Sequence, residues 1–436
     1  MSKKWLSVIG LSTVGLIVSA CGSSGSKTGE DVPAPKQRDP VELVFYYTSP
    51  ADWNEDTFMG TFGNYIKEKL PHITPKFLQA GTGTNLPELV TAGQQIDVIF
   101  VSTGLTSRMT DVDLQYDITP LLKQMNYNDS HLEPQALAAG REIAKGGLYG
   151  LPVYTVPATM YYNKDIFDKF GVAYPKDGQT WDEVYEIAKK INRSDGNSKY
   201  LGLRTSLGHF LHLNSFSLDL VSPSTNRSDF SDERWKRVFE NIQRFYQFAD
   251  TPVTKADMNL NKQRDGFFKD QNVGMWLALT NLHVPPELNN QFNWDIATFP
   301  VFSGTKEGPQ PYPTYFYVTS TSKHKEDALE AIALLTSKEY QMEKSKSGQL
   351  LTILKDPEVR AAFGQQEGSV YKGKNVKALL PETYAKPSYY TQYASTVRSE
   401  LEKALMSVIV GEKDINSALR EAQEISNQKI DTAEGK

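Results

Sequence analysis

The sequence has little cysteine and no surplus of positive charge. One cysteine, at position 21, occurs among 436 residues. A single cysteine forms no internal disulfide and supplies no multi-cysteine zinc or iron–sulfur site. Lys and Arg total 47 against 52 Asp and Glu, which gives a formal net charge of −5. A protein that binds nucleic acid through a broad basic surface is therefore not expected.

The N-terminal apolar stretch is too short to make a good membrane span. Trp5–Val18 carries no charge, and Lys3 and Lys4 precede it. The hydrocarbon core of a bilayer needs about 20 apolar residues to be crossed by a helix. A basic start, a short apolar region and small residues in that order are typical of an export signal. We therefore predict a signal peptide over residues 1–20.

The run Val18-Ser19-Ala20-Cys21 resembles the bacterial lipobox. This resemblance implies that the thiol of Cys21 is diacylated and that the chain is cut before it. Two acyl chains anchor a protein stably to a membrane. The alternative is a cysteine that happens to lie near a secretory signal. Residues 21–40 are rich in Gly, Ser, Pro and charge, so we predict a lipidated flexible tether.

From residue 41 onward, predicted strands alternate with predicted helices. This alternation favours an α/β fold with a parallel sheet covered by helices. The near-continuous apolar run at 96–101 is typical of a strand buried on both faces. Thr180 and Glu183 form a capping box at the start of a helix. The pattern predicts strands at 41–47, 73–78, 96–101, 273–279, 295–300 and 315–320, and helices at 55–70, 86–92, 180–191, 232–248, 325–336 and, broken at Gly411, 394–432.

Several stretches, taken in order, resemble the extracellular solute-binding proteins of bacterial ABC importers, in the group that mostly binds carbohydrates. No single motif decides the match, and their order and spacing carry it. The stretches are GLYGLP at 147–152 with MYYNKDIF at 160–167, TWDE at 180–183, FKDQNVGMW through FNWDIATFP at 268–300, SKHKEDAL at 322–329 with LTSKE at 335–339, and VGEKDINSAL at 410–419.

The resemblance implies a two-lobe, type II periplasmic-binding-protein-like fold. Residues 41–154 and 302–345 would form the N-terminal lobe, and 155–301 and 346–436 the C-terminal lobe, joined by hinge strands. The protein would capture a carbohydrate, most simply an oligosaccharide, between the lobes and deliver it to an ABC permease. It would act as a monomer on the outer face of the cell membrane, without catalysis, cofactor or nucleic acid.

Candidate ligand contacts follow the predicted strands, because ligands of open α/β sheets lie beyond the carboxyl ends of strands. A sugar needs aromatic faces for stacking and polar groups for its hydroxyls. Trp53 offers a face and Asp52 an acceptor after the first strand. Asn85 follows the second strand and Thr103 the third. Trp53 could instead cap a helix, and Asn85 could be an N-cap residue.

The remaining candidates come from the hinge and the second lobe, and for the tyrosines core packing is an equally open interpretation. His209 lies three residues before His212, a spacing that metal sites use on helices. We predict no metal there, because no third ligand lies nearby. The further candidate ligand-binding residues are Tyr154, His209, Trp276, Asn281, Tyr315, Tyr389 and Tyr390.

Other functional classes stay open at this point. A secreted glycosidase needs two carboxylates at a defined separation, which sequence alone does not exclude. The folded body contains no Gly-x-Ser-x-Gly, His-Glu-x-x-His or P-loop pattern. A binding protein for an amino acid, a polyamine or a metal would need a charged site. A surface chaperone or structural lipoprotein would need no internal cleft.

Overall fold

The computed structural model describes residues 38–50, 53–249, 251–280 and 292–436. The predicted signal peptide, Cys21 and nearly all of the tether lie outside these ranges, as do Asp52 and Asn281. Residues Pro40–Lys436 form one unit by their internal contacts, and the fold below is that of this unit. No helix within the described ranges is long and apolar enough to cross a membrane.

The first sheet has six described strands in the order β11-β4-β10-β3-β1-β2. β1 runs parallel to both β2 and β3, whereas β10 is antiparallel to β3 and β4, and β11 is antiparallel to β4. The strands are β1 (Val41–Tyr47), β2 (Ile73–Gln79), β3 (Val98–Ser102), β4 (Gly150–Thr155), β10 (Pro313–Val318) and β11 (Leu351–Thr352).

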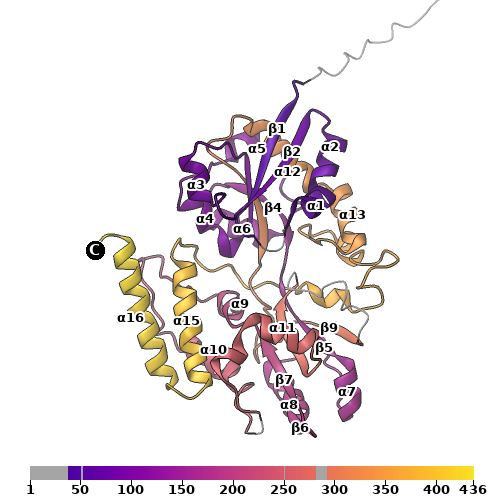
Figure 1. The fold of residues 1–436 in the computed structure, drawn as a ribbon, viewed down its shortest axis with the longest axis vertical. Coiled ribbons are helices and arrows are strands. Elements are labelled where there is room, and N and C mark those ends of the chain that lie inside the picture. Colours follow the sequence, from indigo (N-terminus) through magenta and orange to yellow (C-terminus); the bar gives the residue numbers. More distant parts are fainter. Residues whose placement is uncertain (1–37, 51–52, 250, 281–291) are drawn as a thin grey trace, which may run out of the picture. The chain divides into compact units, whose positions relative to one another are not determined.

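The second sheet has five described strands in the order β6-β7-β8-β5-β9. Of these pairs, β7 and β8 are parallel, and the other neighbours are antiparallel. The strands are β5 (Ala158–Asn163), β6 (Arg193–Asp195), β7 (Ser198–Thr205), β8 (Val273–Leu279) and β9 (Trp294–Ala297). Two lobes, each built on one sheet, follow from this arrangement (Figure 1).

The prediction of a parallel sheet is wrong in part, because both sheets are mixed. Only Val156 and Pro157 separate β4, in the first sheet, from β5, in the second. A parallel pair within one sheet needs a long crossover. Strands reached directly from the other lobe need none, and β5 and β10 accordingly join their sheets antiparallel to their neighbours.

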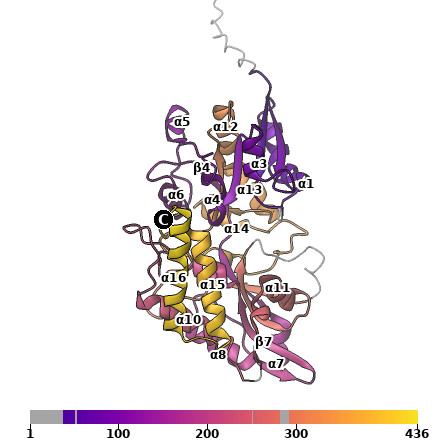
Figure 2. The same cartoon turned by 60° about the vertical axis from the view of Figure 1, so that its left-hand side comes forward.

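Helices cover both sheets, and α15 and α16 lie side by side (Figures 1 and 2). In the first half of the chain they are α1 (Glu55–Phe58), η1 (Met59–Gly63), α2 (Asn64–Lys69), α3 (Leu86–Thr91), η2 (Thr103–Leu105), α4 (Ser107–Thr110), α5 (Thr119–Gln124), α6 (Pro134–Ile143), α7 (Lys164–Phe170), α8 (Trp181–Ile191) and α9 (Leu207–His212). They continue with α10 (Glu233–Gln243), η3 (Lys255–Met258), α11 (Leu260–Phe268), α12 (Lys325–Leu335), α13 (Lys338–Ser347), α14 (Pro357–Ala361), η5 (Val376–Leu379), α15 (Ala394–Ile409) and α16 (Ile415–Ala433).

Most predicted helix boundaries agree with the structure within a few residues. The capping box is confirmed: the Glu183 backbone N–H donates to Thr180 Oγ1, and the Thr180 N–H donates to Glu183 Oε2. The helix predicted over 232–248 ends early, at Gln243. Tight turns follow it and carry Phe245 and Tyr246 into the core, where both side chains are buried.

The helix predicted over 55–70 contains a π-helical turn, η1. Wider turns of this kind leave carbonyl groups for partners outside the helix. Here α13 supplies them: the Tyr340 hydroxyl donates to the Thr61 carbonyl at 3.0 Å, and Lys344 Nζ donates to the Gly60 carbonyl at 3.4 Å. The turn therefore fixes this helix against α13.

A close backbone approach makes Gly150 irreplaceable in β4. A Cβ at this position would lie 2.1 Å from the backbone oxygen of Phe316 on β10. Overpacking against backbone costs about 3 kcal/mol, so Gly150→Ala should lower the free energy of unfolding by about that amount. Gly60→Ala is the control, because no atom lies within 4 Å of the added methyl group. Urea unfolding checks both variants, and equal stability of the two would contradict the β4–β10 packing.

Candidate functional site

Two cavities lie where strands of the two sheets end. We call the first the Tyr389 cavity; its volume is about 60 Å³. It is lined by Thr103, Gly104, Ser107, Ala139, Ile143, His212, Leu213, Leu220, Gln310, Pro311, Pro387, Ser388, Tyr389, Tyr390, Thr391, Ala394, Ser395 and Arg398. The second, the Trp53 cavity, measures about 200 Å³ and is lined by Trp53, Tyr154, Thr155, Val156, Thr280, Gly348, Gln349, Leu350, Leu351, Phe363 and Tyr371.

Both cavities lie beyond the carboxyl ends of strands, where the sequence predicts the ligand. Trp53 follows β1 and Thr103 follows β3 in the first sheet. In the second sheet, His212 belongs to α9, which follows β7, and Thr280 follows β8. Each cavity thus has walls from both lobes, so a molecule held there contacts both.

Gln310 organises one wall of the Tyr389 cavity. This buried side chain donates from Nε2 to the Asn214 carbonyl at 3.0 Å. Its Oε1 accepts from the Ser388 backbone N–H at 2.7 Å and from the Ser388 hydroxyl at 2.9 Å. The Tyr389 N–H donates to Asp219 Oδ1 at 2.6 Å. These bonds fix the backbone that presents Tyr389 and Tyr390 to the cavity.

Among the described residues that line the two cavities, Arg398 is the one charged residue. It lies on α15, and a Cβ built on Gly104 would lie 3.3 Å from its Nη1. This helix of the second lobe therefore places a guanidinium against the loop after β3. Glu402 lies one helical turn further and accepts a hydrogen bond from the Gly208 backbone; burial raises the pKa of its carboxyl.

Two histidines of α9 surround Tyr312 beside this guanidinium. The ring centroids of His209 and His212 lie 5.9 and 5.8 Å from that of Tyr312, both edge-on. The Ser102 hydroxyl donates to the Tyr312 hydroxyl at 3.2 Å, and Ser206 Oγ lies 2.6 Å from His209 Nδ1. Burial, with a smaller effect of Arg398, lowers the pKa of His209 to about 4 and of His212 to about 3. Both rings are therefore neutral at pH 7.

The lowered histidine pKa values predict a pH dependence of stability. The ordinary pKa of histidine is 6.5. As the pH falls from this value toward about 4, the two histidines take up protons in the unfolded chain but stay neutral in the folded protein. The contribution of the two neutral histidines to the free energy of unfolding is therefore complete above this window and is lost as the pH falls through it. We expect His209→Gln combined with His212→Gln to flatten the decrease. Urea unfolding between pH 4 and 8 measures this, and parallel curves for variant and wild type would contradict it.

The Trp53 cavity has an aromatic wall. The half-buried Trp53 ring lies 5.0 Å from Phe62, 5.8 Å from Phe100 and 6.3 Å from Tyr154. Phe62 and Tyr154 stack at 6.2 Å, so the hinge tyrosine is part of the same aromatic group. A rigid aromatic surface of this kind suits the C–H face of a ligand.

Each cavity also contains a hydroxyl that has no partner among the described residues. These are Thr103 Oγ1 in the Tyr389 cavity and Thr280 Oγ1 in the Trp53 cavity. Buried polar atoms in native structures are nearly always hydrogen-bonded, to protein or to ordered water. Both hydroxyls are therefore available to bond an ordered water or a ligand within the cavities.

The prediction that Trp276 and Tyr315 contact the ligand is wrong, because both are core residues. Trp276 is fully buried on β8 among Tyr161, Phe267 and Phe268. Tyr315 is fully buried on β10, and its hydroxyl donates to the Ala136 carbonyl. Neither lines the two cavities. Every residue of β8 and of β10 is buried, because helices or loops cover both faces of these central strands, so an aromatic residue within them packs.

The prediction that Asn85 contacts the ligand is also wrong. Asn85 is a helix-capping residue, which is the alternative interpretation of the sequence. It forms the N-cap of α3, and its backbone N–H donates to Glu88 Oε2 at 3.2 Å. It lines neither cavity. The cavities are lined by Thr103, Tyr154, Trp53, Tyr389 and Tyr390, whereas His209 lines neither of them and lies edge-on to Tyr312. The proposed contacts of Asp52 and Asn281 fall outside the described residues.

Sequence reasoning missed Arg398 and Thr280. Arg398 lies within a predicted helix, and sequence alone does not distinguish an arginine that lines a cavity from one on the exposed face of such a helix. Thr280 directly precedes Asn281, so the sequence predicts the correct loop after β8 but names the neighbouring residue. Gln310 was missed because its role depends on the Asn214 and Ser388 backbones, which are distant in sequence.

Residues 51–342 match the family described as bacterial extracellular solute-binding proteins. This chain belongs to that family. Among curated relatives, a binding protein named as putative from Brucella abortus is 24% identical over 309 residues, which cover 66% of this chain and 70% of that protein. A mannitol-binding protein of Pseudomonas aeruginosa is 26% identical over 154 residues, 35% of this chain and 31% of that protein.

Solved structures of ABC substrate-binding proteins share the fold of this solute-binding protein. One from Listeria monocytogenes, in complex with cycloalternan, has a TM-score of 0.72 at 17% identity and covers 90% of this chain and 99% of its own. A sugar transporter protein from Rhizobium etli has a TM-score of 0.70 at 20% identity, with coverage of 88% and 99%. The predicted two-lobe, periplasmic-binding-protein-like α/β fold is confirmed.

Proposed function

We propose that this extracellular solute-binding protein captures a carbohydrate between its lobes and delivers it to an ABC permease. The observation that carries the proposal is the pairing, in two cavities walled by both lobes, of aromatic faces with unpartnered hydroxyls. Sugars need this combination, because they present C–H faces for stacking and hydroxyls for hydrogen bonds. The carbohydrate ligands named for the Listeria and Pseudomonas proteins agree with this class of solute.

The charge of the cavities favours a neutral solute over a polyamine or a metal ion. No acidic residue is among the described residues that line either cavity, and Arg398 is the single charged one. Among these described residues a cation would find no counter-charge, whereas the neutral His212 ring and the Arg398 guanidinium can donate to sugar hydroxyls. The same guanidinium makes a solute with one carboxylate, such as an acidic sugar, the second candidate.

Capture by closure explains why the ligand contacts come from both lobes. Pockets for small molecules usually measure about 300–1,000 Å³, so the Tyr389 cavity, at about 60 Å³, widens when the ligand enters. We assign residues 41–154 and 302–345 to one lobe and 155–301 and 346–436 to the other, with one correction. Strand β11 (Leu351–Thr352) pairs with β4 and therefore belongs to the first lobe. Ligand contacts in both lobes favour the closed state by differential affinity, with no bond made or broken.

The N-terminus completes the proposal. A lipid on Cys21 would hold the monomer on the outer face of the membrane through the tether at 21–40, after removal of residues 1–20. Cys21→Ser should then release the protein from the membrane fraction, and its retention there would contradict the anchor.

A thermal-shift screen tests the proposed ligand class. Residues 40–436 are screened against mono- and oligosaccharides, with amino acids, polyamines and divalent metals as the comparison set. A ligand bound only by the folded state raises the melting temperature by mass action. We expect a shift with a carbohydrate. Shifts with amino acids, polyamines or metals alone would exclude carbohydrate binding.

A further inference from the structure

A histidine and two carboxylates converge on the surface of the first lobe, away from both cavities. His72 lies in the turn between α2 and β2, and Asp327 and Glu330 lie on α12. His72 Nε2 is 3.4 Å from Asp327 Oδ1 and 3.8 Å from Glu330 Oε2, and one ligand atom of each residue lies within 4.8 Å of the others. We propose that these residues, which we call the His72 cluster, bind a divalent transition metal ion, in the first place Zn²⁺.

The spacing of the ligand atoms matches the coordination geometry of zinc. Zinc binds histidine nitrogen at about 2.0–2.1 Å and carboxylate oxygen at about 2.0–2.2 Å, in a tetrahedron, so two of its ligand atoms are about 3.4 Å apart. The distances of 3.4 and 3.8 Å from His72 Nε2 are close to this value. Small side-chain rotations therefore suffice to admit the ion. Three protein ligands leave the fourth position to water.

The donor atoms select the class of metal. Calcium and magnesium prefer oxygen ligands throughout, whereas imidazole suits zinc and other first-row transition metals. The side chain of His72 is 13% exposed, that of Asp327 26% and that of Glu330 28%, so an ion reaches the cluster from solvent. Carboxylates held this close repel each other, and a cation between them removes the repulsion.

Regular elements hold the three ligands in place. Asp327 and Glu330 are neighbours on the surface of α12, whose other side is buried. The His72 carbonyl accepts a hydrogen bond from the Val41 N–H at 2.8 Å, which fixes the turn against the start of β1. Ligands supplied by such elements give a precise site, because little order is lost on binding. A bound ion joins α12 to the edge of the sheet, and no local sequence pattern predicts this contact between distant segments.

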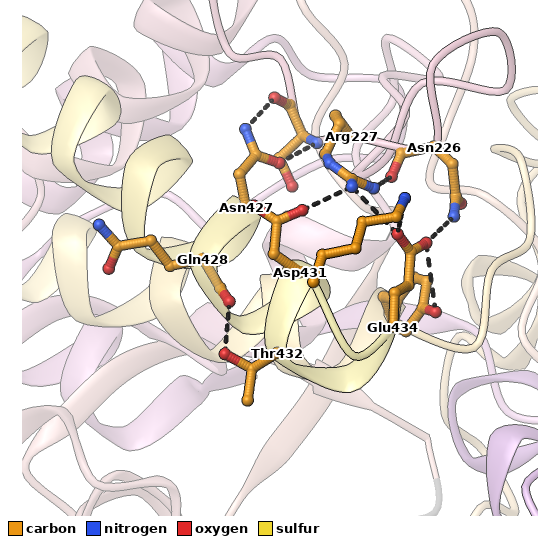
Figure 3. Close-up of polar contacts among 10 residues, drawn as sticks. Asn226, Arg227, Asn427, Gln428, Asp431, Thr432 and Glu434 are labelled. Atoms are coloured by element: carbon orange, nitrogen blue, oxygen red, sulfur yellow. Dashed lines mark hydrogen bonds and ion pairs between the residues drawn. The ribbon is translucent and has the colours of Figure 1, made fainter.

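A second pair of carboxylates with the same sequence spacing provides a contrast. Asp431 Oδ1 and Glu434 Oε2, at the end of α16, both accept from Arg227 Nη2, at 2.5 and 3.0 Å (Figure 3). A guanidinium stays protonated and has no lone pair for a metal, so these residues form an ion pair. Imidazole has a lone pair when it is neutral, and His72 can therefore be a metal ligand.

Titration with zinc chloride tests the His72 cluster. Residues 40–436, prepared without a histidine tag and treated with a chelator, should bind one Zn²⁺ per chain in calorimetry and melt at a higher temperature with the ion present. Loss of an outer partner of a metal ligand already costs about 10- to 100-fold in affinity. His72→Gln should therefore weaken zinc binding by about 100-fold or more, and Glu330→Gln, which changes only an exposed side chain, by about tenfold or more.

The matched control is Asp431→Asn combined with Glu434→Gln, which removes two carboxylates of the same spacing and should keep the zinc affinity of wild type. Magnesium and calcium should not raise the melting temperature. Absence of zinc binding by wild type, or zinc binding retained in both His72→Gln and Glu330→Gln, would leave a histidine–carboxylate ion pair only and overturn the proposal. A preference for calcium or magnesium, or an equal loss of zinc affinity in the control, would overturn it as well.

The metal site and the proposed carbohydrate site are independent. The residues of the His72 cluster line neither cavity, so His72→Gln should leave the glycan affinity unchanged. A zinc-dependent rise in melting temperature that disappears in Glu330→Gln belongs to the cluster and does not identify a metal as the captured solute. Failure of zinc binding therefore leaves the proposed function intact, and failure of glycan binding leaves the metal site intact.

Discussion

Replacing Arg398 with alanine is expected to weaken carbohydrate binding by roughly 10- to 100-fold. A hydrogen bond to a charged group contributes about 1.5–3 kcal/mol, and each 1.4 kcal/mol changes affinity tenfold. Arg398 has this effect because it lines the Tyr389 cavity from α15 and also lies against Gly104 of the other lobe. Calorimetric titration with the glycan identified by thermal shift measures the loss.

Two further variants distinguish the loss of a direct ligand contact from the effect of changing the net charge of the protein. Arg420→Ala removes an exposed arginine from α16, outside both cavities, and should leave the affinity unchanged. Arg398→Lys keeps the charge but loses the planar pair of donors, so its affinity should lie between those of alanine variant and wild type. Unchanged affinity in Arg398→Ala would exclude the Tyr389 cavity as the ligand site.

Replacing Trp276 with alanine is expected to lower the free energy of unfolding by about 3–5 kcal/mol, the usual cost of removing a large buried aromatic side chain. The indole is fully buried on β8 and stacks 6.0 Å from Phe267, with Phe268 edge-on at 5.4 Å. Chemical unfolding of the variant measures the loss. Because Trp276 lines neither cavity, the glycan affinity of the remaining folded protein should be that of wild type.

Trp53→Ala should show the opposite behaviour. This ring is half-buried and lines a cavity, so its removal costs ligand contact more than core packing. We expect a loss of affinity of about tenfold, the scale of one aromatic contact, with less change in stability than in Trp276→Ala. If Trp276→Ala impaired binding and Trp53→Ala impaired stability alone, the division between cavity and core residues would be wrong.

Strands and helices were largely predictable because their hydrophobic periodicity is local. The strand at 41–47 and the capping box at Thr180 agree with the structure. The directions of the strands were not predictable from periodicity. β10 and β4 are antiparallel neighbours because the chain arrives from the other lobe, and this depends on long-range topology. The π-helical turn at Met59–Gly63 likewise depends on Tyr340 and Lys344, far along the chain.

The site was predictable as a set of loops more than as a set of side chains. The rule that ligands lie beyond strand ends led to Trp53 and Thr103, which line the cavities. It failed for Trp276 and Tyr315, which lie within strands covered on both faces. Residue type cannot separate these cases, because a tryptophan packs as well as it stacks on a sugar. The role of Arg398 could not be predicted from sequence, because helix α15 brings this residue to the loop after β3 only in the folded chain.

The central claim is that a carbohydrate binds between the lobes, and calorimetric titration of residues 40–436 with the glycan panel tests it most directly. The account predicts saturable binding of one glycan per chain, strongly weakened by Arg398→Ala and unchanged by Arg420→Ala. Binding of an amino acid, a polyamine or a metal ion, with no heat from any glycan, would contradict it.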